Sequence, residues 1–160
     1  MTVLLEMVWP FPPLGKERPR GRVFWPQGKS RPPSVNIYTP TRTDHEERDM
    51  LNTARFLTRY RDLCTMARLH VCAVKARPKA RPALVPREVW ATGRRCPRPV
   101  DPDGDNVIKL VADALSRKKE PPSQRILRHD GLIVEWYQLD QYAARGESPC
   151  VEIELLQWES

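Results

Sequence analysis

Three aspartates occupy alternate positions in the middle of the chain, at Asp101, Asp103 and Asp105, where a proline-rich stretch gives way to an apolar repeat. Carboxylate oxygens are the ligands that Mg²⁺ takes from proteins, and a magnesium ion that keeps several waters leaves room for a phosphate oxygen. Such an ion can polarise a phosphodiester, supply hydroxide and stabilise the leaving oxygen. The stretch therefore predicts a metal site for phosphodiester hydrolysis.

A lysine and a further aspartate follow on the same side of a helix predicted over about 105–117. At about 100° per residue, Asp105, Lys109 and Asp113 succeed one another on the surface of this helix. A lysine one turn from the carboxylates can neutralise the charge that develops on a phosphate in the transition state. The opposite, core-facing side is predicted to comprise Val107, Leu110, Val111, Ala114 and Leu115.

Two other roles for these aspartates are less consistent with the sequence. One aspartate at a helix start is a common cap, helped by the helix dipole, but two or three exceed what a cap uses. An EF-hand calcium loop also opens with alternate aspartates. Its sixth position requires Gly and its twelfth Glu, whereas this chain has Asn106 and Ala112. We therefore favour a magnesium site over a simple cap or a calcium loop.

The sequence around these residues resembles the RusA family of Holliday junction resolvases. The family motif Asp-x-Asp-Asn-x-x-Lys-x-x-x-Asp-Ala-Leu matches residues 103–115, and the acidic position downstream of it matches Asp130, which follows His129. One branch of the family also carries a Gly-Lys-x-Arg-x-Arg element and a Tyr-Thr-Pro element, which match residues 15–20 and 38–40. The resemblance thus spans most of the chain.

This resemblance implies an Mg²⁺-dependent endodeoxyribonuclease, for which Mn²⁺ can substitute, that resolves Holliday junctions or related branched DNA in recombination and repair. It also implies a homodimer, which suits the cutting of two strands at a junction with two-fold symmetry. A phage origin, and a location in the host cytoplasm, would fit the family. The implied metal ligands are Asp103, Asp105 and Asp130; Lys109 would be the catalytic lysine, Asp113 a supporting residue, and Lys16, Arg18, Arg20 and Arg42 the DNA-backbone contacts.

Two alternatives remain open. The family's usual acidic pair is reduced here to His129 and Asp130, so the chain could be a branched-DNA-binding protein with weak or no nuclease activity. The loop over residues 117–128 is also longer and more basic than the family pattern. A structural or interaction protein is suggested only by the proline-rich basic segments, and that hypothesis leaves the Asp-Lys-Asp surface unexplained.

Composition and charge are compatible with a nucleic-acid partner. The chain has 27 Lys and Arg against 20 Asp and Glu, a net charge of +7 that would attract polyanions. No apolar run approaches the roughly 20 residues of a membrane span, and the N-terminus does not resemble a signal peptide, so a cytoplasmic location is expected. The cysteines form no C-x-x-C pair, which argues against a zinc ribbon, and Cys64 and Cys72 are interpreted as small buried residues.

The predicted architecture is one domain, residues 1–160, of the α+β class, with a small mixed β-sheet packed with two main helices. Strands are expected at 3–8, 69–75, 132–137 and 151–155, with a hairpin formed by 22–25 and 35–38. In the first strand, Val3, Leu5 and Met7 are expected to share one buried face.

The first helix is predicted to begin at Thr43, which would cap it together with Glu46. Its core-facing stripe is expected to be Met50, Ala54, Leu57, Tyr60 and Cys64. Two basic, Pro- and Arg-rich loops are predicted, at about 10–34 and 77–100. The second carries seven Lys and Arg against one acid, Glu88, and is interpreted as a mobile DNA clamp.

Overall fold

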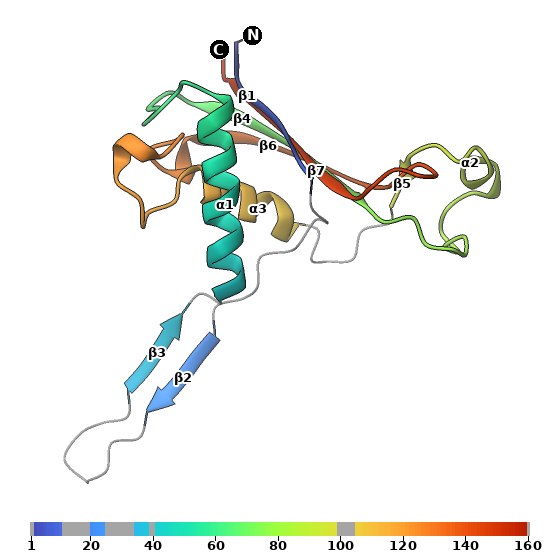
Figure 1. The fold of residues 1–160 in the computed structure, drawn as a ribbon, viewed down its shortest axis with the longest axis horizontal. Coiled ribbons are helices and arrows are strands. Elements are labelled where there is room, and N and C mark those ends of the chain that lie inside the picture. Colours follow the sequence, from blue (N-terminus) through green and yellow to red (C-terminus); the bar gives the residue numbers. More distant parts are fainter. Residues whose placement is uncertain (1, 11–19, 25–33, 39–40, 99–104, 160) are drawn as a thin grey trace.

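The computed structural model describes residues 2–10, 20–24, 34–38, 41–98 and 105–159. For 20–24, 34–38 and Asp105 only the backbone is described. The fold is a small α+β domain, as predicted, in which helices pack against a five-stranded mixed sheet (Figure 1). None of the described helices has the length and apolar character needed to cross a membrane.

The strands of the main sheet lie in the order β1-β7-β4-β6-β5. Only β4 and β6 are parallel; the other neighbours run antiparallel. Because β1 and β7 are paired, the first and last strands of the chain lie side by side (Figure 1). The bounds are β1 (Val3–Trp9), β4 (Ala67–Lys75), β5 (Cys96–Pro97), β6 (Ile133–Tyr142) and β7 (Cys150–Gln157).

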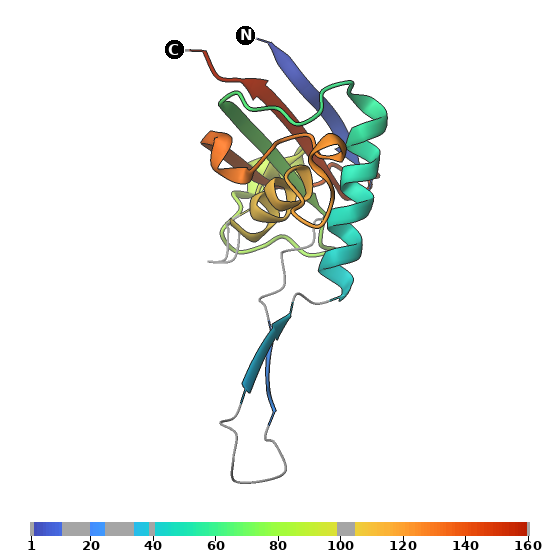
Figure 2. The ribbon, with the colours of Figure 1, turned by 90° about the vertical axis from the view of Figure 1, so that its left-hand side faces the viewer.

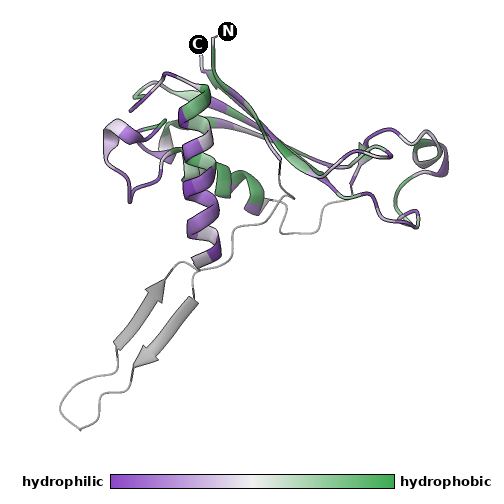
Figure 3. Ribbon diagram, in the orientation of Figure 1, coloured by the Kyte–Doolittle hydropathy of each residue, from purple (hydrophilic) through white to green (hydrophobic). Residues whose placement is uncertain are grey.

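The two long helices, α1 (Thr41–Leu57) and α3 (Asp105–Leu115), cover one face of this sheet and pack against each other (Figure 2). α1 contacts β1, and α3 contacts β4 and β6. Figure 3 shows α3 as mostly apolar, whereas the N-terminal half of α1 is hydrophilic. The main core therefore lies between the sheet and these helices, and α3 is the more deeply enclosed of the two.

The four strands predicted for the main sheet are all present and are longer than predicted, although β6 begins at Ile133 and not at Leu132. In β1 a register shift between Val3 and Leu5 changes which residues face the core. Leu4, Leu5 and Met7 are buried, while Val3 is 48% exposed. The strict alternation predicted for this strand is therefore wrong at its first residue, because a bulge interrupts the period of two.

The prediction for α1 is wrong at both ends. The helix begins at Thr41, so Thr43 is a buried first-turn residue and not a cap. It ends at Leu57, which is 52% exposed. Tyr60 and Cys64 lie beyond it and cannot extend a helical stripe. The buried positions, Thr43, Glu47, Met50, Leu51 and Ala54, recur at three- and four-residue intervals and define one helical face.

The predicted hairpin is confirmed. It is a separate two-stranded antiparallel sheet formed by β2 (Arg20–Phe24) and β3 (Ser34–Tyr38). It projects away from the main sheet beside the start of α1 (Figures 1 and 2). The cysteine interpretation is corrected, since Cys64 is exposed and Cys72 half-buried, whereas Cys96 and Cys150 are the buried ones. Cys64 is exposed because it lies in the irregular segment that follows α1.

Candidate metal and nucleic-acid site

The exposed side of α3 is narrower than the sequence predicted. Lys109 is exposed and Asp113 half-buried, and all five predicted core residues are buried. Ile108 and Ala112 are buried as well, because α3 packs against α1 on one flank and against the sheet on the other. Lys109 therefore stands on a thin polar strip of an otherwise enclosed helix.

The predicted metal ligands are described to different extents. Asp101 and Asp103 lie outside the described residues, and Asp105 opens α3 with its side chain not described. Asp130 is described: it opens the short 3-10 helix η2 (Asp130–Leu132), which packs against α3. Its side chain is half-exposed, and its Oδ1 accepts a hydrogen bond from the Gly131 amide at 3.2 Å. Among the described residues, no salt bridge neutralises this carboxylate.

The segment that leads into η2 is fixed to the C-terminal end of α3. The backbone amides of Ile126 and Leu127 both donate to the carbonyl of Leu115, at 3.0 Å each. Leu63 adds two backbone bonds, donating to Ile126 at 2.9 Å and accepting from Arg128 at 3.0 Å. Ile126 and Leu127 are fully buried. The position of Asp130 is therefore set by a firm anchor three residues before it.

This anchor limits how Asp130 can approach the start of α3. Three residues of extended chain span at most about 10 Å. The helix from Asp105 to Leu115 is about 15 Å long. Starting from Leu127, the chain must run back along α3 for the Asp130 carboxylate to approach that of Asp105. The contact between η2 and α3 is compatible with this path.

His129, which takes the place of an acid in the family motif, is exposed and lies over the η2 turn. A Cβ atom at Gly131 would come within 3.2 Å of its Nδ1 atom. An imidazole nitrogen suits zinc or copper better than magnesium. Among the residues whose side chains are described, no group of three or more His, Cys, Asp or Glu could hold a metal ion. Asp103 and Asp105 lie outside that set.

Asp113 belongs to a polar cavity between α1 and the segment that follows α3. The cavity has a volume of about 260 Å³, and Asp113 lines it together with Asp44, Glu47, Ser116 and the basic run Arg117 to Lys119. This surrounding is compatible with the supporting role that the family resemblance implies for Asp113.

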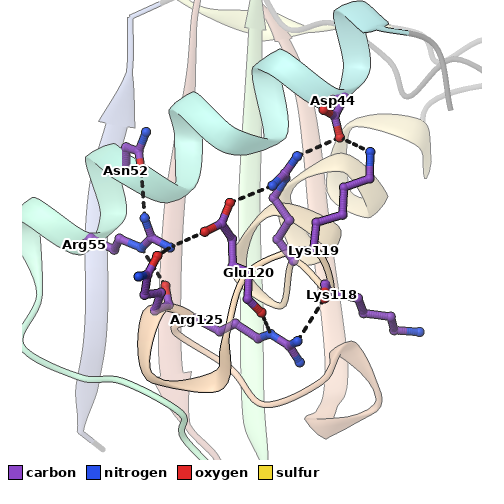
Figure 4. A network of polar contacts seen from close by, with 9 residues as sticks. Asp44, Asn52, Arg55, Lys118, Lys119, Glu120 and Arg125 are labelled. Atoms are coloured by element: carbon purple, nitrogen blue, oxygen red, sulfur yellow. Dashed lines mark hydrogen bonds and ion pairs between the residues drawn. The ribbon is translucent and has the colours of Figure 1, made fainter.

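A network of ion pairs beside this cavity joins α1 to the segment that follows α3 (Figure 4). Asp44 on α1 accepts hydrogen bonds from Arg117 at 2.6 Å and from Lys119 at 2.5 Å. Arg117 also donates to Glu120 at 2.8 Å, and Glu120 in turn pairs with Arg55 of α1 at 3.3 Å. The hydrogen bond from Lys119, with that from Arg117, holds the pKa of Asp44 below its usual value, against the opposing effect of burial. Sequence spacing gave no sign of this network, because its members lie up to 75 residues apart.

The arginines of α1 and the segment after it divide into structural and exposed groups. Arg55 donates to the Gln124 carbonyl at 2.5 Å, and Arg61 donates to three backbone carbonyls between residues 55 and 60. These two are therefore structural rather than free for phosphate. Arg48 and Arg59 are exposed.

The predicted DNA contacts lie mostly in the N-terminal part. Lys16 and Arg18 fall outside the described residues, and Arg20 opens β2 with its side chain not described. Arg42 is exposed in the first turn of α1, where its Nε atom pairs with Glu46 at 3.1 Å. The hairpin and the first turn of α1 are neighbours in the fold, so Arg20 and Arg42 come from adjoining elements (Figure 1).

Comparison with known proteins adds no family assignment. No family model matches the chain, and no curated protein matches it.

Proposed function

We propose that this protein is a metal-dependent endodeoxyribonuclease that cuts branched DNA, such as a four-way junction, in the manner of the RusA resolvases. The observation that carries the proposal is the packing of η2, which bears Asp130, against α3, which begins at Asp105 and displays Lys109. Segments that lie about 20 residues apart in the sequence, and that hold the separated parts of the motif, are thereby neighbours.

In this proposal Asp103, Asp105 and Asp130 hold a Mg²⁺ ion, or Mn²⁺ in its place, which would polarise the phosphodiester when bound. Three carboxylates are a donor set that suits these hard cations. Lys109 projects from the exposed strip of α3, one turn after Asp105, where an ammonium group can bind the scissile phosphate. Asp113, on the following turn, supports this surface.

The DNA backbone would be bound by the N-terminal cations Lys16, Arg18, Arg20 and Arg42. Arg42 stands at the start of α1, next to the projecting hairpin that begins at Arg20 (Figure 1). A homodimer would present two such sites with two-fold symmetry, which matches the symmetry of a four-way junction.

Cleavage of a labelled synthetic four-way junction, with a linear duplex of equal length as the reference substrate, tests this proposal. We expect junction cutting with Mg²⁺ that stops on addition of EDTA. Asp105→Asn and Asp130→Asn should abolish cutting, because each removes one metal ligand while preserving side-chain shape. Asp49→Asn is the matched control, since it removes the same charge from an exposed position of α1 and should cut normally.

Metal titration by calorimetry separates this proposal from a DNA-binding protein without nuclease activity. The nuclease predicts Mn²⁺ binding that is lost in Asp130→Asn. A wild-type protein that binds junctions but neither binds Mn²⁺ nor cuts would overturn the nuclease proposal and favour the binder.

A further inference from the structure

The cation-rich segment between β4 and α3 folds into a lobe with the turn that joins β6 to β7. We define this basic lobe as residues 76–98 together with 143–147. The first segment, which the sequence predicted as a loop, contains the short helix α2 (Arg87–Ala91) and the strand β5. Figure 1 shows the part of the lobe that contains α2 at one end of the sheet, well separated from α3. A ligand on this part is therefore outside the site that contains Lys109.

Arg77 holds the two segments of the lobe together. Its guanidinium group lies 3.7 Å from the centre of the Trp90 ring. It also donates to the carbonyls of Trp90 at 2.6 Å, Arg94 at 2.8 Å and Ala143 at 3.3 Å. A planar guanidinium can stack on an aromatic ring and bond to several carbonyls at once. Arg77 is thus a structural residue that joins α2 to the turn after β6.

A backbone hydrogen bond and a close contact also join the segment after α2 to the turn after β6. The Arg145 amide donates to the Gly93 carbonyl at 2.8 Å. Gly93 has a φ of 70°, and a Cβ atom there would lie 3.0 Å from the Cδ atom of Arg145. The backbone conformation therefore favours glycine here, and a Cβ atom would require the exposed Arg145 side chain to shift.

Two further arginines of the lobe are neutralised by acids. Arg95 pairs with Glu147 and with Glu152, the latter at 2.7 Å. Its hydrogen bond to Glu147, with another from the Ala144 amide, holds the pKa of Glu147 below the usual value. Arg98 lies 3.8 Å from the buried Asp140. These acids are therefore occupied and leave the outer cations of the lobe uncompensated.

Arg81 donates to the carbonyl of Val85. The remaining cations, Lys79, Arg87, Arg94 and Arg145, are exposed. In the part of the chain that the structure describes, none of the four side chains forms a salt bridge or a hydrogen bond. Residues 76–98 carry seven Lys and Arg against one acid, a net charge of +6, while the whole chain has +7. This segment is thus strongly basic, and part of its charge is not used to hold the fold.

A cavity of about 440 Å³ lies between the two segments of the lobe, lined by Arg77, Lys79, Trp90, Arg145 and Glu147, among others. Because Glu147 is paired with Arg95, the free charges that border the cavity are cationic. The lobe therefore offers a hollowed, positively charged surface on a folded scaffold.

We propose that the basic lobe binds a DNA backbone and, in the enzyme proposed above, holds a second arm of the branched substrate while α3 acts on the first. Duplex DNA presents one negative charge for about every 1.7 Å of its axis, so a set of separated cations can each meet a phosphate. This inference rests on the proposed function for its substrate, although DNA binding by the lobe can be measured without cleavage.

The test compares two double variants that remove equal charge. Arg87→Ala/Arg94→Ala removes two free cations of the lobe, and Arg48→Ala/Arg59→Ala removes two exposed cations elsewhere. Binding of the full chain to an uncut four-way junction is measured in EDTA across a range of NaCl concentrations. All four positions are exposed, and circular dichroism checks that both variants fold.

Loss of two phosphate contacts should make the plot of log affinity against log salt less steep, with a slope smaller in magnitude by about 1.8. Between 50 and 200 mM NaCl, the wild type should then lose about 12-fold more affinity than the lobe variant. The control variant should keep the wild-type slope. An unchanged slope in the lobe variant, or an equal fall in the control, would overturn the inference.

These outcomes are distinct from those that test the nuclease. A wild type that binds junctions without cutting, with a reduced slope in the lobe variant, would refute the proposed function and support the lobe. Metal-dependent cutting with an unchanged slope would refute the lobe alone. Inorganic phosphate that competes as strongly as DNA would overturn the inference in favour of a simple anion site.

Discussion

Replacing Arg117 by alanine should destabilise the protein far more than replacing Lys119, although both cations bind the same oxygen of Asp44. The two contacts have similar lengths, 2.6 Å and 2.5 Å. Their exposures differ, because the Arg117 side chain is 6% exposed and that of Lys119 is 62% exposed. Exposure, and not distance, should therefore decide the energetic difference.

The magnitude depends on the groups that each variant leaves without a partner. Arg117→Ala removes charged hydrogen bonds to both Asp44 and Glu120, whose side chains are only 24% and 20% exposed. Breaking a buried pair costs about 3–5 kcal/mol, and partial exposure of the acids favours the low end, about 3 kcal/mol. An exposed pair such as Lys119 to Asp44 contributes about 1 kcal/mol or less. The expected gap is about 2 kcal/mol.

Urea unfolding followed by tryptophan fluorescence measures this gap, and thermal unfolding checks it independently. Arg117→Ala should lower the melting temperature by about 6–12 °C and Lys119→Ala by no more than about 4 °C. Adding Asp44→Asn to each variant completes two double-mutant cycles, and the coupling should be larger with Arg117. Equal losses for the two variants would show that burial does not govern this network.

Three further predictions concern charge, pH and the lobe. Because the pKa values of Asp44 and Glu147 are lowered in the folded state, both carboxyls stabilise the fold above their unfolded values and lose this effect as the pH falls through the folded ones. The urea concentration at the unfolding midpoint should therefore decrease when the pH is lowered below about 4. The difference in midpoint between the wild type and Glu147→Gln should close over the same pH range, and a constant difference would contradict this. Gly93→Ala and Gly146→Ala should each cost about 1–2 kcal/mol in urea unfolding through their positive φ, and a clearly larger loss in Gly93→Ala would show that the Arg145 side chain cannot move away from the added Cβ atom. Arg77→Lys keeps the charge but loses the planar contacts with Trp90, so it should change the tryptophan fluorescence of the protein and weaken DNA binding, which a purely charge-based effect would not do.

The sequence predicted the architecture well because it depends on patterns that are local. Alternating apolar residues located β4 and β7, and the amphipathic run after Asp105 located α3 with its buried face. The ends of α1 were misplaced because a helix end depends on neighbouring packing. Glu47 lies on the buried face of that helix, where a charged residue gave no signal of burial.

For the candidate site, the sequence predicted which residues are involved but not how the fold positions them. The motif named Asp130 and Lys109, and the structure places η2 against α3, but the anchor through Leu63 and Leu115 had no counterpart in the sequence. The roles of the arginines were the least predictable, because residue type alone does not distinguish an arginine that joins two segments from one that is exposed to solvent. Arg77 and Arg94 lie in the same basic segment, yet Arg77 bonds to three carbonyls while the Arg94 side chain is exposed.

The backbone anchor also explains why a long insertion between α3 and Asp130 is compatible with a shared site. Ile126 and Leu127 are bonded to Leu115, the last residue of α3, so the intervening residues 116–125 leave and return at nearly the same point. Because the two ends of this loop lie close together, its length does not shift the segment that follows it. Arg117 fixes this loop to α1 through Asp44. The position of Asp130 therefore depends on the three residues after Leu127, and not on the length of the loop before it.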